Sequence, residues 1–80
     1  MKAQHRRIQS SPDVVLGKPV IRGTRITVEA ILDKLAADIP IEEILRDYPR
    51  LTRADVLAAI SYARRAVGTD EVIPRRVAMR

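Results

Sequence analysis

Few side chains in this 80-residue chain have the chemistry that catalysis requires. Acid–base and nucleophilic mechanisms need a nucleophile beside a base, or several ligands that converge on a metal ion. The chain has a single histidine, His5, in a polar segment at its N-terminus, and it has no cysteine. We therefore do not expect an enzyme, and we predict neither a metal site nor a cofactor.

The stretch GKPVIRGT, from Gly17 to Thr24, is the second feature with possible chemistry. A phosphate-binding loop ends in Gly-Lys-Ser/Thr, because its lysine holds the phosphates and its hydroxyl binds the metal. This stretch lacks that ending. Nucleotide binding is therefore not expected.

The charges of the chain are unevenly distributed. Lysine and arginine outnumber aspartate and glutamate by 15 to 10, and the excess lies near the two ends. Residues 27–48 carry six acids against only Lys34 and Arg46. A basic surface suits a polyanion such as DNA, but it can equally bind an acidic protein, so charge alone leaves both partners open.

Length and composition predict one small domain in the cytoplasm. Eighty residues leave no room for a second core. The first ten residues, MKAQHRRIQS, lack the apolar stretch of a signal peptide. No apolar run approaches the roughly 20 residues that span a bilayer, so we expect no membrane association.

Apolar spacing and capping residues predict three helices. They are expected at residues 28–37, at residues 41–48 and from Thr52 to residue 66 or 67, with Gly68 as the stop. Thr27 should cap the first helix. Thr52 and Asp55 resemble a capping box for the third.

The helices are preceded by a region of short apolar runs and turn residues. The expected strand or anchor residues, separated by proline and glycine, are Ile8, Val14–Leu16 and Val20–Ile21. On the third helix we expect an inward face and an outward face. The inward residues are Val56, Ala59, Ile60, Ala63 and Val67, and the outward residues are Ala58, Ser61, Arg64 and Arg65.

The second and third helices, joined by a short turn, can be either a plain helical hairpin or a helix-turn-helix, whose last helix enters the major groove of DNA. Arg50, Thr52 and Arg53 would then lie near phosphates or base edges, together with Arg22 and Arg25 from the preceding loop. The outward face has no asparagine or glutamine suited to reading adenine. Phosphate contacts are therefore expected rather than base recognition.

Several motifs occur in the order and spacing of one protein family. They are Gly17-Lys18-Pro19, Ile21-Arg22-Gly23-Thr24-Arg25, Glu43-Ile44-Leu45, Tyr48-Pro49 and Leu51-Thr52. From about Ile8 to Ala66 the chain resembles the family called domain of unknown function 433, often described as VapB-like antitoxins. One departure is Asp38-Ile39-Pro40, where the family has a glycine and a serine or threonine. Asp38 would then need a left-handed conformation.

The resemblance implies a mainly α fold: a three-helix, homeodomain-like helix-turn-helix bundle with a short N-terminal β-strand region and a flexible C-terminal tail. It also implies an antitoxin of a type II toxin–antitoxin system that neutralises a PIN-like ribonuclease toxin and binds promoter DNA. The tail would bind the toxin and place an arginine in its acidic centre. The residues expected to do so are Val72, Ile73, Arg75, Arg76, Val77 and Arg80.

These expectations divide the chain into a disordered basic arm at residues 1–7, one domain at residues 8–67 and the tail at residues 68–80. A homodimer is expected, because apolar Val14, Val15 and Leu16 are hard to cover in so small a core and strand edges near them invite pairing. The alternative is a structural adaptor that binds only proteins.

Overall fold

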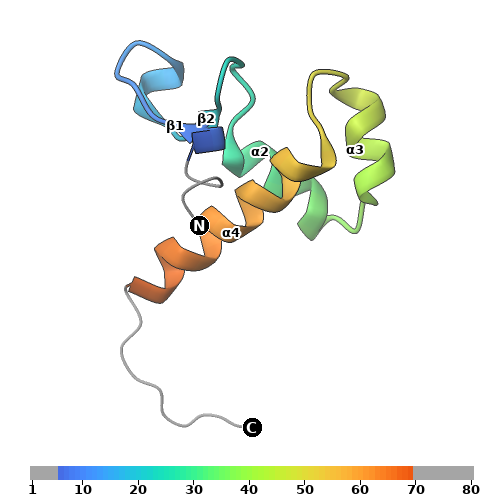
Figure 1. The fold of residues 1–80 in the computed structure, drawn as a ribbon. Helices are drawn as coiled ribbons and strands as arrows, with labels where there is room; N and C mark the ends of the chain where they lie inside the picture. The colour runs from blue at the N-terminus through green and yellow to red at the C-terminus, as the bar shows by residue number, and fades with distance from the viewer. Residues whose placement is uncertain (1–5, 70–80) are drawn as a thin grey trace, which may run out of the picture.

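The computed structural model describes residues 6–69. It is mainly helical, with three α-helices and one short two-stranded antiparallel sheet (Figure 1). The elements are β1 (Ile8–Gln9), the 3-10 turn η1 (Val15–Gly17), β2 (Val20–Ile21), α2 (Val28–Ala36), α3 (Ile41–Asp47) and α4 (Arg53–Thr69). The predicted combination of three helices and a short strand region is thus confirmed.

Helix α2 begins and ends on local signals. The Ala30 amide donates a hydrogen bond to Thr27 Oγ1 over 2.9 Å, so Thr27 is the cap that the sequence predicts. After the helix, Asp38 has a φ of 67°, and the amides of Asp38 and Ile39 donate to the carbonyls of Leu35 and Lys34. These two bonds form a Schellman motif with aspartate in the place of the usual glycine, as expected for this linker.

Helix α3 is bounded by two prolines. Pro40 occupies its N-cap position, where its missing amide costs no hydrogen bond. The helix ends at Asp47, one residue before the predicted end, and Tyr48 is its C-cap with a φ of −123°. The following Pro49 disfavours helical geometry at Tyr48, which explains the shorter helix.

Helix α4 starts with the predicted capping box. The Thr52 amide donates to Asp55 Oδ2 over 2.9 Å, and the Asp55 amide donates to Thr52 Oγ1 over 3.2 Å. The prediction that Gly68 stops the helix is wrong, because α4 continues through it to Thr69. Glycine ends a helix only where a left-handed residue is needed, and Gly68 has no positive φ.

The buried side of α4 also differs from the prediction. Val56 and Ala59 are fully buried as expected, but Ala58 is fully buried too, although it was expected to face outward. Ile60 and Val67, which were expected to face inward, are 38% and 71% exposed. The helix contacts β1 as well as α2 and α3, so its buried arc is turned toward the N-terminal strands.

The N-terminal region forms one strand pair and one irregular loop. Ile8 pairs with Ile21 and Gln9 with Val20, so two of the predicted apolar runs form strands. Val14–Leu16, expected to form a strand or to anchor this region, forms no strand. Val15 and Leu16 have φ values of 47° and 57°, which lie outside the extended region that a strand requires. The amides of Val14, Gly17 and Lys18 donate to carbonyls within the same loop. The side chain of Leu16 is 93% exposed.

Arg6 and Arg7, assigned to the disordered arm, lie against the folded body. Arg7 Nη1 donates to Asp55 Oδ1 over 3.0 Å, and the Arg7 carbonyl accepts from the Arg22 amide over 2.7 Å. Composition gave no sign of these contacts, since Asp55 is 48 residues further along the chain.

One cluster of apolar side chains holds the elements together, and it draws on β2 and all three helices. Its members are Ile21, Val28, Ile31, Ile44, Leu51, Val56 and Ala59. Among the described residues, no helix is both long and apolar enough to cross a membrane.

Candidate nucleic-acid interface

The loop between β2 and α2 is held rigidly by its own hydrogen bonds. Thr24 Oγ1 donates to the Ile21 carbonyl over 2.8 Å and accepts from the Ile26 amide over 2.9 Å. Gly23 has a φ of 80°, a left-handed conformation that glycine adopts without strain. Arg25 lies on this loop and is exposed, so its guanidinium group is carried by a fixed backbone.

The turn between α3 and α4 places a second arginine beside this loop. The Leu51 amide bonds to the Tyr48 carbonyl over 2.9 Å, and Leu51 itself is buried, which anchors the turn to the core. Arg50 Nη2 donates to the carbonyl oxygen of Gly23 over 3.1 Å. The bond connects two loops 27 residues apart in the sequence.

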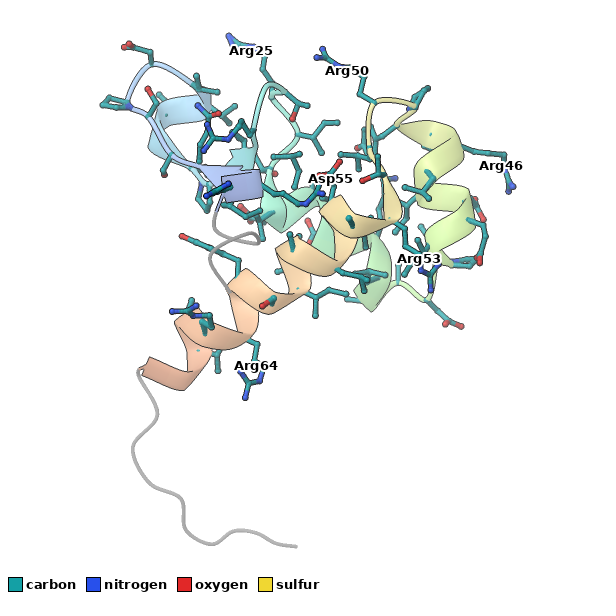
Figure 2. All side chains as sticks on the ribbon, in the orientation of Figure 1. Arg25, Arg46, Arg50, Arg53, Asp55 and Arg64 are labelled. Carbon is teal, nitrogen blue, oxygen red and sulfur yellow. The ribbon has the colours of Figure 1, made fainter. Side chains whose placement is uncertain are left out.

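Arg25 and Arg50 border one hollow of about 490 Å³. Figure 2 shows both side chains extending from the same edge of the molecule. The other residues that line the hollow are Gln9, Val14, Gly23, Thr24 and Ile26. Two permanently charged guanidinium groups, with several N–H donors each, suit a phosphate or carboxylate group.

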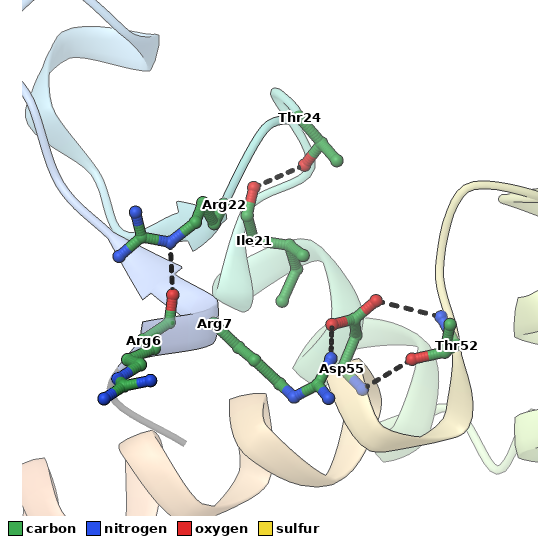
Figure 3. Close-up of polar contacts among 7 residues, drawn as sticks. All are labelled: Arg6, Arg7, Ile21, Arg22, Thr24, Thr52 and Asp55. Carbon is green, nitrogen blue, oxygen red and sulfur yellow. Dashed lines mark hydrogen bonds and ion pairs between the residues drawn. The ribbon is translucent and has the colours of Figure 1, made fainter. Parts of the chain in front are cut away.

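Two other predicted contact residues are engaged within the protein (Figure 3). Arg22 Nε donates to the Arg6 carbonyl, and this bond holds the segment before β1. The Thr52 hydroxyl caps α4 by accepting from the Asp55 amide. Both side chains therefore have structural roles, and neither lines the hollow.

Arg53 lies away from the hollow. Figure 2 shows Arg53 and Arg64 on one side of α4 and Arg25 and Arg50 at the opposite edge of the molecule. The structure thus brings together two of the five predicted DNA-contact residues, Arg25 and Arg50. Gln9 was not predicted to take part, because its position depends on the register of β1 with β2.

The expected toxin-binding residues at positions 72–80 lie outside the described residues. Within residues 6–69, no three histidine, cysteine, aspartate or glutamate side chains lie close enough together to hold a metal ion.

Three comparisons place the chain among known proteins. Residues 8–63 match the family described as "Protein of unknown function (DUF433)". A protein of Sinorhizobium fredii, "Uncharacterized protein y4eO", is 38% identical over 56 residues, which are 70% of this chain and 25% of that protein. The chain thus spans about a quarter of the length of this relative.

A solved structure has a similar fold. The crystal structure of a DUF433 member from Anabaena variabilis matches with a TM-score of 0.75 and 32% sequence identity. The match covers 85% of this chain and 67% of that one. The sequence resemblance to this family is confirmed, and the chain belongs to the DUF433 family.

Proposed function

We propose that the chain is an antitoxin that binds promoter DNA through Arg25 and Arg50 and neutralises a PIN-like ribonuclease. The observation that carries the DNA-binding part is the shared hollow, where the two guanidinium groups come from separate loops onto one exposed edge. Arg50 lies in the turn between α3 and α4, which follow each other in the order of a helix-turn-helix.

DNA phosphates are the proposed ligand of this pair. Arginine binds phosphate with parallel N–H donors, and phosphate contacts fix the register of a protein on DNA without reading its sequence. The exposed residues near the start of α4 are Arg53, Ala54 and Leu57, which include no asparagine or glutamine. Phosphate contact is thus better supported than recognition of bases.

A titration of promoter DNA tests this part of the proposal. The double substitution Arg25→Ala with Arg50→Ala should weaken binding at least tenfold at moderate salt, because it removes two charged contacts. Arg53→Ala removes an exposed arginine that does not line the hollow. It is the control and should change DNA binding less than twofold. Equal effects of the two variants would show that the hollow is not the contact site.

The antitoxin part rests on the family resemblance and on the sequence of residues 70–80. This segment contains Arg75, Arg76 and Arg80 among apolar residues. A guanidinium group can occupy an acidic metal centre in place of magnesium, while Val72, Ile73 and Val77 would bury apolar surface on the toxin.

Truncation after Thr69 separates the two activities, because it keeps every described element. The truncated chain should still bind DNA but should lose neutralisation of the ribonuclease encoded beside it. Full inhibition by the truncated chain would exclude the tail as the toxin-binding segment. An unmodified chain that neither binds promoter DNA nor inhibits the ribonuclease would instead favour the adaptor hypothesis.

A further inference from the structure

Within residues 6–69, no other element covers an apolar face formed by α2 and the C-terminal half of α4. Leu32 of α2 lies beside Ala63 and Val67 of α4, and these three residues line two adjoining hollows of about 680 and 310 Å³. Ile60 lines the larger hollow and is 38% exposed, and Val67 is 71% exposed. Apolar side chains grouped in this way on a small protein mark a contact surface.

The two long edges of this face carry opposite charges. Along α4, Arg64 is one residue beyond Ala63, is exposed and borders the larger hollow (Figure 2). Along α2, Glu29 and Asp33 are four residues apart and both are exposed beside Leu32. Lys18 bonds to Glu29 over 2.9 Å, so Asp33 supplies the acidic charge of that edge.

We propose that this face is the contact between two copies of the chain in a two-fold dimer whose α4 helices run parallel. A two-fold rotation about an axis parallel to α4 places the basic edge of one copy opposite the acidic edge of the other. Arg64 of each copy then meets Asp33 of its partner. An antiparallel arrangement would bring like charges together. A face with one basic and one acidic edge is therefore complementary to its own rotated copy, as an isologous interface requires.

This inference goes beyond DNA binding and does not rest on it. It also moves the expected dimer contact away from Val14–Leu16, since that segment forms a left-handed turn rather than a strand edge. The proposed dimer contact is instead the C-terminal half of α4. The buried side of this helix faces β1, so Ile60 and Val67 lie on the surface.

Charge reversal tests the pairing directly. The unmodified chain should sediment as a dimer of the 9.0 kDa subunit at tens of micromolar. Arg64→Glu alone and Asp33→Arg alone should each shift the protein to monomer, because each places like charges opposite one another twice. An equimolar mixture of the two variants should restore the dimer, since both pairs are then complementary. Arg46→Glu, at an exposed position on α3, is the control and should leave the dimer unchanged.

The parallel orientation of the two α4 helices can be tested with introduced cysteines, because the chain has no cysteine of its own. Near a two-fold axis that runs along α4, Ile60→Cys and Val67→Cys should each form a disulfide with the same residue of the other copy under mild oxidation. Ser10→Cys is an exposed control and should not. The proposal would be overturned if the unmodified chain were a monomer. It would also be overturned if either charge-reversal variant dimerised alone, or if neither Ile60→Cys nor Val67→Cys formed a disulfide. A monomer would also indicate that residues 70–80 or another protein cover the face.

Discussion

Arg7 and Asp55 join the segment before β1 to the first turn of α4. Arg7 Nη1 lies 3.0 Å from Asp55 Oδ1, while Oδ2 of the same carboxylate accepts from the Thr52 amide (Figure 3). One buried carboxylate thus caps a helix and holds a residue 48 positions away. The side chain of Arg7 is 45% exposed, so the ion pair itself contributes at most about 1 kcal/mol.

Replacement of Asp55 should separate these two roles. Asp55→Ala removes the cap and the ion pair, and it should lower the free energy of unfolding by about 2 kcal/mol in urea denaturation. Asp55→Asn keeps an acceptor for the Thr52 amide and should cost less than half as much. Asp47→Asn, at an exposed acid 3.9 Å from Lys34, serves as the control with little change. Equal losses for Asp55→Ala and Asp55→Asn would contradict the capping role.

The left-handed residue after α2 gives a second prediction. Asp38 has a φ of 67° and is exposed, and glycine adopts this conformation without the strain of a Cβ atom. Asp38→Gly should therefore raise the free energy of unfolding by about 1 kcal/mol. Ala36→Gly, at the last residue of α2, should instead lower it, by less than about 1 kcal/mol. If both glycines destabilise the protein equally, the Schellman motif is not present in solution.

A glycine in the turn at η1 should also stabilise the protein. Leu16 has a φ of 57° and its side chain is 93% exposed, so little packing is lost when the side chain is removed. Leu16→Gly should raise the midpoint of thermal unfolding, with a gain in stability of about 1 kcal/mol. Leu16→Ala keeps the Cβ atom and should have little effect. A lower midpoint for Leu16→Gly would mean that Leu16 packs against something in solution.

The salt dependence of DNA binding should count the proposed phosphate contacts. Each phosphate neutralised adds about −0.9 to the slope of log K against log salt. The double substitution Arg25→Ala with Arg50→Ala should thus make the slope shallower by about 2, whereas Arg53→Ala should leave it unchanged. A slope that stays the same in the double variant would show that neither arginine contacts a phosphate.

The sequence predicted those parts of the fold that depend on neighbouring residues. The caps at Thr27 and Thr52 and the break at Pro40 follow from contacts within four positions, and all three are present. The left-handed Asp38 is also present, but it was expected from the family resemblance. Local hydrogen bonds decide such features, so local patterns reveal them.

The features that were missed depend on distant contacts. The burial of Ala58 in place of Ile60 follows from the contact of α4 with β1, which periodicity along one helix cannot show. The left-handed Val15 was also missed, because a β-branched residue in that conformation goes against local preference. For the candidate site, Arg25 and Arg50 were predicted, but their separation from Arg53 depends on which way α4 faces.

The spread of the buried cluster along the chain affects how the protein is made. Ile31 and Ile44 are fully buried only together with Val56 and Ala59 of the last helix. A ribosome adds about 5–20 residues per second, so the early apolar residues leave it before their partners exist. We therefore expect the described domain to fold only after α4 has left the ribosome, and its apolar segments to be open to chaperones and proteases until then.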